Sequence, residues 1–487
     1  MTPRLRPRDL ALLAHESPAT PMHHATVEIF DPGDSGFDHD RLLSLVEERI
    51  SFVPRYRCRL QWVPGRVTTP AWVDDPHFDL NFHVRRSALP RPGSMDQLRE
   101  LVARIVSRPL DRSRPLWEVY VVEGLEQGRV AVLWKSHLAL VDGIHTVDLG
   151  QVLLDTGPEP RPLGGDDWLP THRASPLGVL SDAVTDVVHD PRLAWDALRA
   201  NTASAIRAAG GAADRAGRVA GALAHRRPAP VSPISGDLSQ QRRVVTVRTD
   251  LTDYRRVREA SGGSVNDVIL ATVAGALRAW LMTRAESLDD IRRIRAVAPV
   301  SVIDDELEAT SLGSQIVLHW VDLPVGEPSP VLRLHQVSYS FEAHRRTGRG
   351  VAADRLAALS GFAPATFHAV GARVAAEELG RGFQLAVTNV PGPQSPLFTG
   401  GARMLETYPV HPLLPGHALA IGVTSYDGSV FYGITADRYL LPDVDLLGQC
   451  VTDALDELVD ATSGSRGRAS RGRAPRGRRT TRKQPRR

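Results

Sequence analysis

The stretch Val130-Ala-Val-Leu-Trp-Lys-Ser-His-Leu-Ala-Leu-Val-Asp-Gly-Ile-His145 decides how the fold is interpreted. Its first five residues are apolar and rich in valine, which is typical of a buried strand. The run Val147–Leu154 that follows indicates the start of a helix. Loops between such elements commonly carry functional side chains. The segment 135–145 is therefore the first candidate for a functional site.

Alternating strand and helix patterns extend from this stretch in both directions. Upstream, the spacing of apolar residues predicts strands at 26–30 and 117–122, helices at 41–50 and 97–106, and a hairpin turn at 123–128. Downstream, it predicts strands at 243–249, 294–300, 315–322, 383–388, 418–425 and 429–436, with helices at 264–283, 329–345 and 444–459. Hairpins among these strands indicate mixed sheets, so the chain is expected to be an α/β protein with flanking helices.

The chain has 487 residues, which is long enough for two domains. Segments rich in proline and glycine at 157–170 and 228–236 enclose an alanine-rich helical pattern at 177–225. We therefore predict four regions: an N-terminal half at 1–165, a helical connector at 166–240, a C-terminal half at 241–460, and a disordered Arg-rich tail at 461–487.

Composition excludes several classes of protein. Hydrophobic residues make up 42% and charged residues 24%, which is an ordinary globular balance. We find no stretch of roughly 18 to 20 apolar residues and no apolar signal region at the N-terminus, so a cytoplasmic, non-secreted protein is expected. Cys58 and Cys450 are too far apart to indicate a disulfide framework or a metal site. Nucleotide-binding, zinc-protease and serine-hydrolase motifs are also missing from the sequence.

A histidine stands five residues before Asp142-Gly143 at the predicted strand exit. This arrangement resembles the HHxxxDG motif of the bacterial wax ester synthase/diacylglycerol O-acyltransferases, a longer form of the HxxxD motif of CoA-dependent acyltransferases. Other segments similar to that family follow in the family's order across roughly residues 8–460: Glu16–His23, Pro54–Leu60, Pro115–Trp117, Glu123–Leu125, Ser264–Asp267, Ala298–Ser301, Thr388–Pro393, Ser425–Gly428 and Ala436–Asp437.

The resemblance implies a two-domain CoA-dependent acyltransferase fold with an active-site channel at the domain interface. Long-chain acyl-CoA would be the co-substrate, and diacylglycerol or a long-chain alcohol would be the acceptor. The products would be triacylglycerol or wax ester and free CoA. No metal and no further cofactor are implied.

The sequence departs from the family motif at its most important position. His137 aligns with the first histidine, whereas Leu138 replaces the second, which the family uses as catalytic base. Attack of a hydroxyl on a thioester needs a proton acceptor, and leucine cannot be one. Three alternatives stay open. His137 takes the role, His145 reaches back across one helical turn, or the protein keeps the pocket as a lipid- or acyl-CoA-binding protein with little turnover.

The resemblance assigns supporting roles to the two residues that end the motif. Asp142 would orient the histidine loop through an ion pair with an arginine, and a carboxylate at a helix N-terminus would also cap that helix. Gly143 would let the backbone approach the substrate closely, because it has no Cβ.

Two further polar pairs are candidates for substrate binding. Asn266 and Asp267 match a pair that matters for activity or folding in the family, and the alternative is a plain helix N-cap. Thr388 and Asn389 could direct polar groups at the thioester oxygen or the CoA arm, and the alternative is a strand end before a Pro-Gly turn. His23-His24 mimics the motif but lacks Asp-Gly and lies within a predicted strand, so we interpret it as structural.

The tail carries most of the positive charge. Between Arg466 and Arg487 there are 11 basic residues and no acidic one, so the net charge of +3 becomes −8 without them. Such a tail could bind nucleic acid, attach the enzyme to an anionic membrane or lipid-body surface, or have no selected role. Lipid substrates favour the peripheral membrane attachment, and nucleic acid is not expected as a partner.

Overall fold

The computed structural model describes residues 4–62, 69–140, 149–161, 232–284, 286, 288, 291–301, 316–345, 364–377 and 382–471. Most of the predicted connector at 166–240 lies outside these ranges, and so do 472–487 of the tail.

Two six-stranded mixed sheets form the body of the molecule. The first sheet has the strand order β11-β12-β1-β6-β5-β4, spanning Phe398–Thr399, Ala402–Val410, His23–Asp31, Val130–His137, Trp117–Glu123 and Val84–Ala88. The second has the order β7-β14-β13-β10-β8-β9, spanning Arg242–Asp250, Ser429–Asp437, Leu419–Tyr426, Leu385–Pro391, Ile294–Ser301 and Ile316–Leu323. A separate pair, β2 and β3, spans Cys58–Gln61 and Ala71–Asp74.

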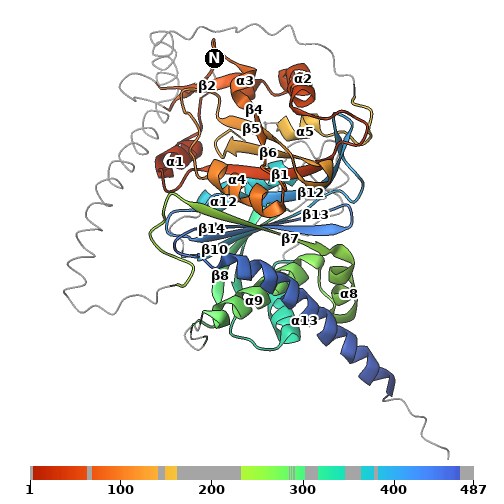
Figure 1. Cartoon of the computed structure of the whole chain (residues 1–487). Coiled ribbons are helices and arrows are strands. Elements are labelled where there is room, and N and C mark those ends of the chain that lie inside the picture. The colour runs from red at the N-terminus through yellow and green to blue at the C-terminus, as the bar shows by residue number, and fades with distance from the viewer. Residues whose placement is uncertain are drawn as a thin grey trace, which may run out of the picture.

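Helices pack against both sheets. Those of the N-terminal part are α1 Pro7–His15, α2 His39–Arg49, α3 Leu80–His83, α4 Met95–Val106 and α5 Leu149–Leu153. Those of the C-terminal part are α8 Leu251–Ser261, α9 Val265–Thr283, α10 Pro330–Arg345, α12 Pro364–Glu377 and α13 Val444–Arg471. Figure 1 shows α8, α9 and α13 below the second sheet, whereas α12 lies between the two sheets and contacts β1, β8 and β10.

The predicted α/β class with mixed sheets is confirmed, and the predicted elements appear with similar bounds. β5 and β6 pair antiparallel, as the turn at 123–128 predicts. β10 runs parallel to both β8 and β13, whereas β13 and β14 form an antiparallel hairpin. Several of these strands are buried along almost their whole length, so short apolar runs made them recognisable.

The division into two halves differs from the prediction in one respect. β11 and β12 belong to the C-terminal part of the chain but complete the first sheet, where Val27 of β1 lies opposite Tyr408 of β12. β12 also packs on β13 and β14 of the second sheet. A Cβ at Gly433 would lie 1.7 Å from the Pro409 carbonyl oxygen, so glycine is what permits this close approach. The two halves are therefore interlocked.

Two other expectations about helices are corrected. α13 continues to Arg471 instead of ending at 459, so the first part of the predicted disordered tail is helical. Within this continuation, the Thr462 side chain is buried and its hydroxyl donates to Leu458 O. Among the described residues, α9 is long and apolar enough to cross a membrane, although 72% of it is buried inside the protein. That burial is typical of a core helix.

Candidate active site

The end of β6 carries the start of the motif, His137 and Leu138. His137 is the last residue of β6 and lies opposite His23 of β1. The Leu138 N–H donates to Met22 O at 3.0 Å, which extends the pairing by one residue. Successive side chains of extended backbone point to opposite faces. His137 and Leu138 therefore enter different surroundings.

His137 has a polar contact at each of its ring nitrogens. The Ala139 N–H donates to Nδ1 at 3.0 Å, and Nε2 lies 3.6 Å from Glu16 Oε2. Because Nδ1 accepts, the proton of the neutral ring lies on Nε2 and faces this carboxylate. The side chain is 1% exposed. His137 would have to rotate out of this arrangement before either nitrogen could take a proton from a substrate.

Glu16 is the partner that sequence reasoning did not assign. Its carboxylate also accepts from Arg112, whose second nitrogen donates to Leu13 O at 2.9 Å. Burial alone would raise the pKa of Glu16, but its contacts with His137 and Arg112 lower that pKa to about 2. In the sequence, only the family-like segment Glu16–His23 could have drawn attention to Glu16, and that resemblance assigns no role to its carboxylate.

Replacement of Glu16 is expected to change the acid sensitivity of the fold. The pKa of Glu16 falls from 4.5 to about 2 on folding, so its stabilisation is complete above pH 4.5 and is lost between about pH 4.5 and pH 2. Glu16→Gln should therefore lose on the order of 3 kcal/mol of unfolding free energy at pH 7, with a difference from wild type that shrinks towards pH 2. Chemical denaturation at several pH values measures it. A difference that is constant from pH 7 to pH 2 would contradict this assignment.

Leu138 is completely buried at the interface between the two halves. It belongs to an apolar cluster contributed by both parts of the chain: Leu12, Met22, Leu138, Val297, Ala372, Ala375, Ala376, Phe383 and Leu414. The position at which the family carries its base is thus an apolar packing position. Asp142, Gly143 and His145 lie outside the described residues.

Asn266 and Asn389 are brought together, although they are far apart in the sequence. Asn389 Nδ2 donates to Asn266 Oδ1 at 2.8 Å, which connects the end of β10 to the start of α9. Asp267 acts differently from its neighbour. Its carboxylate accepts from the Ser264 N–H at 2.9 Å, and Ser264 Oγ accepts from the Asp267 N–H at 3.2 Å. This reciprocal pair is a capping box, in which Ser264 is the N-cap.

Thr388 points to the opposite face of the second sheet, towards α12. Its Oγ1 is hydrogen-bonded to His368 Nδ1 at 3.0 Å and to His411 Nε2. The structure therefore does not bring Thr388 and Asn389 to one site. Thr388 instead joins a group of buried histidines that sequence reasoning did not connect with it.

These histidines, which we call the imidazole cluster, are His24, His368 and His411. The ring centroid of His24 lies 5.0 Å from that of His411 and 6.2 Å from that of His368. All three side chains are buried, and burial lowers each pKa, that of His411 to about 3. His23 differs, because its Nε2 contacts Val106 O at 2.9 Å, as expected for a structural histidine.

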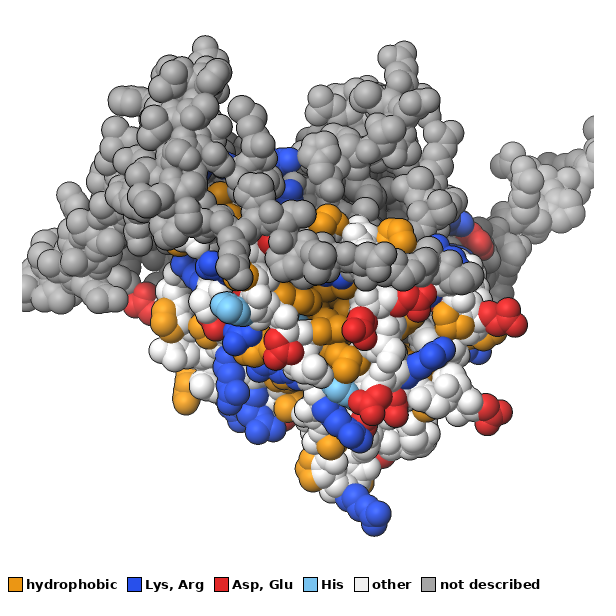
Figure 2. Space-filling model, turned by 90° about the horizontal axis from the view of Figure 1, so that it is seen from above, with side chains coloured by type: hydrophobic (Ala, Val, Ile, Leu, Met, Phe, Trp, Pro, Cys, Tyr) orange, Lys and Arg blue, Asp and Glu red, His pale blue; other side chains and the backbone are white. Residues whose placement is uncertain are grey.

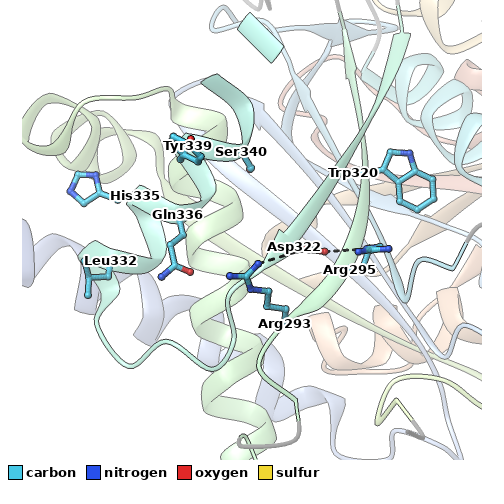
Figure 3. Close-up of a pocket in the computed structure, with 9 residues that line it drawn as sticks. All are labelled: Arg293, Arg295, Trp320, Asp322, Leu332, His335, Gln336, Tyr339 and Ser340. Atoms are coloured by element: carbon cyan, nitrogen blue, oxygen red, sulfur yellow. Dashed lines mark hydrogen bonds and ion pairs between the residues drawn. The ribbon is translucent and has the colours of Figure 1, made fainter. Parts of the chain in front are cut away.

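Two cavities lie near these elements. A small one of about 20 Å³ is bordered by His24, Trp134, Ser136 and the start of α5, and it has room for about one water molecule. A groove of about 610 Å³ lies at the edge of the second sheet between β9 and α10 (Figure 3). In this groove Arg293 and Arg295 are paired with Asp322. Trp320 borders the groove and also packs against the Leu138 cluster.

Two mixed sheets with a histidine-bearing strand exit between them define a CoA-dependent acyltransferase fold. Residues 5–269 match the wax ester synthase/diacylglycerol acyltransferase catalytic domain, and residues 312–459 match the C-terminal domain of the same family. The chain belongs to this family.

Individual relatives agree with the assignment. A probable diacylglycerol O-acyltransferase of Mycobacterium tuberculosis, tgs1, is 33% identical over 87% of this chain and 88% of its own length. A second from that organism, tgs3, is 38% identical over 53% of this chain and 96% of its own length. The solved wax ester synthase/diacylglycerol acyltransferase of Marinobacter aquaeolei VT8 is 25% identical, covers 94% of this chain and all of its own, and has a TM-score of 0.64. A condensation domain of the calcium-dependent antibiotic synthetase shares the fold, with a TM-score of 0.53 and 16% identity.

Proposed function

We propose that the protein moves a long-chain acyl group from acyl-CoA to the hydroxyl of diacylglycerol or of a long-chain alcohol. The match to the family's catalytic domain across 5–269 carries this proposal, because it includes the strand exit at His137. The position of that strand exit supports it, since Leu138 packs among residues of both halves of the chain.

The proposed reaction is direct acyl transfer. The acceptor oxygen attacks the thioester carbonyl carbon, a tetrahedral intermediate forms, and the carbon–sulfur bond breaks. The hydroxyl proton ends on the CoA thiol, so the acyl-CoA and the acceptor are the only reactants. We propose that no metal or further cofactor takes part, since the overall transfer needs neither oxidation nor hydrolysis.

The test uses the purified full chain with oleoyl-CoA and either dioleoylglycerol or hexadecanol. We expect release of free thiol that depends on the acceptor, together with triacylglycerol or wax ester among the extracted lipids. The apolar cluster around Leu138 supports the alternative, in which the protein binds lipid or acyl-CoA with little turnover. Tight oleoyl-CoA binding without thiol release from either acceptor would favour that alternative and overturn the transferase proposal.

We also propose a cytoplasmic enzyme that attaches to anionic lipid surfaces through its basic tail. The 11 basic residues after residue 465 support this, because each adds around 1 kcal/mol near an anionic surface. On the face shown in Figure 2, the body displays both basic and acidic side chains around a hydrophobic group. Because the chain without the tail has a net charge of −8, attraction to anionic lipid is assigned to the tail.

Removal of residues 466–487 is therefore expected to abolish most flotation of the protein with phosphatidylglycerol vesicles. The intact chain should float at 50 mM salt and much less at 500 mM, since screening weakens the attraction. Neutral phosphatidylcholine vesicles are the control. Equal flotation of the intact and shortened chains would contradict attachment through the tail.

A further inference from the structure

Thr388 and two histidines form a buried polar chain at the interface of the two sheets. His368 comes from α12, Thr388 from the middle of β10, and His411 from the residue that follows β12. The side chains are 1%, 1% and 4% exposed. They are joined only through the Thr388 hydroxyl, with His368 Nδ1 at 3.0 Å on one side and His411 Nε2 on the other.

Hydrogen-bond counting fixes what this chain can do. The Thr388 hydroxyl has one proton, so it donates to one imidazole and must accept an N–H from the other. Each imidazole also has an outer nitrogen, which does not contact the Thr388 hydroxyl. Whichever imidazole receives the hydroxyl proton, one outer nitrogen carries a proton and the other does not. Those outer atoms are His368 Nε2 and His411 Nδ1, and both are buried without a hydrogen-bond partner among the described residues. The three hydrogen-bonded side chains can therefore take up a proton at one end and release one at the other.

These three side chains lie next to Leu138, which stands where the family carries its catalytic histidine. Ala372 is one helical turn after His368, and Leu414 is three residues after His411. Both belong to the apolar cluster that contains Leu138. Met22 of that cluster precedes His24, whose ring lies within 6.2 Å of the two other imidazoles between centroids. The imidazole cluster and Leu138 are thus neighbours on the same side of the first sheet.

We propose that His368, Thr388 and His411 form a proton relay that replaces the imidazole missing at position 138. The inference rests on the proposed acyl transfer. The bare nitrogen at one end takes the acceptor's proton as the new carbon–oxygen bond forms. A proton moves through the Thr388 hydroxyl, and the N–H at the other end protonates the sulfur as the carbon–sulfur bond breaks. Both hydrogen bonds of the relay then have the opposite direction, so the first end must release its proton to water and the second must take one from water before the next turnover.

The surroundings keep the relay neutral and in place. Burial lowers the pKa of His368 and of His411, so both rings rest uncharged, and a proton taken up at one end has to be passed on rather than held. The His411 ring lies directly on the backbone of β13, because a Cβ at Gly422 would be 2.6 Å from its Nε2. Glycine at 422 is therefore required for the contact between His411 and Thr388.

The experiment compares acceptor-dependent thiol release from Thr388→Val, Thr388→Ser and Thr272→Val. Valine keeps the shape of threonine but removes the hydroxyl, so Thr388→Val should lower kcat about 10²-fold or more. Serine restores the hydroxyl and should recover most of that loss. Thr272 is the matched control, because it is equally buried and its hydroxyl donates only to Val268 O within α9. Thr272→Val should leave kcat unchanged.

Two further variants separate the relay from a structural role. Gly422→Ala should displace the His411 ring without removing a polar group, and we expect a loss similar to that of Thr388→Val. Leu138→His in the Thr388→Val background should restore thiol release, because it supplies the base directly. Circular dichroism and oleoyl-CoA binding check that each variant is folded and binds its substrate.

Each outcome decides between the two proposals. Wild-type kcat in Thr388→Val would overturn the relay and leave the transferase proposal intact. An inactive wild type with an active Leu138→His variant would also overturn the relay, while showing that the site can perform the transfer. Inactivity of both, with any acceptor, would overturn the proposed function and the relay together.

Discussion

Leu138→His is expected to raise acceptor-dependent thiol release by about 10²-fold, which is at the low end of what a general base contributes. The new imidazole would stand at the strand exit where the family carries its base, and its pKa suits proton transfer near pH 7. The variant should also be less stable, because Leu138 is completely buried in an apolar cluster. An imidazole without a hydrogen-bond partner there would cost on the order of 1–3 kcal/mol.

The matched control for this variant is Leu138→Gln. Glutamine introduces a buried polar group of similar size but cannot accept the proton, so it should lose stability without a gain in rate. Thiol release with oleoyl-CoA and dioleoylglycerol measures the rate, and thermal denaturation measures the stability. Equal rates for Leu138→His and the wild type would mean that the base already acts at full strength elsewhere.

Arg49→Ala is expected to lower the free energy of unfolding by about 3–5 kcal/mol, the largest stability effect that we predict. The Arg49 side chain is fully buried, and its Nη2 lies 3.1 Å from Asp155 Oδ2. It also donates to Val152 O at 2.8 Å and to Arg161 O at 3.0 Å. Removal of the guanidinium would leave the buried Asp155 Oδ2 without its ion-pair partner, although Arg161 would still pair with Oδ1 at 2.8 Å, and it would remove the hydrogen bonds to the chain after α5.

A surface pair provides the comparison. Arg403 and Asp427 approach to 2.9 Å, but the Arg403 side chain is 51% exposed, so Arg403→Ala should change stability little. Urea denaturation of both variants measures the difference. If Arg49→Ala lost no more stability than Arg403→Ala, the buried pair would not hold α2 to the segment 149–161. Asp155→Asn should lose less than Arg49→Ala, because the Arg49 guanidinium would keep its hydrogen bonds to Val152 O and Arg161 O.

Strands and helices with a regular apolar period could be predicted from the sequence. β6 begins with the apolar run Val130–Trp134, β13 and β14 are rich in apolar residues, and α9 has a serine cap directly before its apolar stretch. β12 was missed because Pro409 argues against an interior strand. Nevertheless, β12 lies between β11 and β1, with Pro409 opposite Thr26. Helix α12 was missed as well, since alanine and glycine give it a weak amphipathic pattern.

The candidate site was predictable only where its residues are neighbours in the chain. His137 and Leu138 follow from one motif, and the N-cap interpretation of Asp267 follows from the spacing Ser264–Asp267. The imidazole cluster could not be predicted. Its members stand at 24, 368 and 411, and they meet only because β12 crosses to the first sheet while α12 lies between the sheets. The contact of Asn266 with Asn389 likewise depends on tertiary structure.

The crossing of β12 also has a consequence for biosynthesis. Until residue 410 has left the ribosome, β1 has a neighbour on one side only, and its other edge offers unpaired backbone groups to any passing strand. Pairing across such a separation is slow to form. Nascent chains should therefore need chaperone protection for most of their synthesis. If the gene is divided between the two halves, the N-terminal fragment alone should aggregate, and co-expression of the C-terminal fragment should keep it in solution.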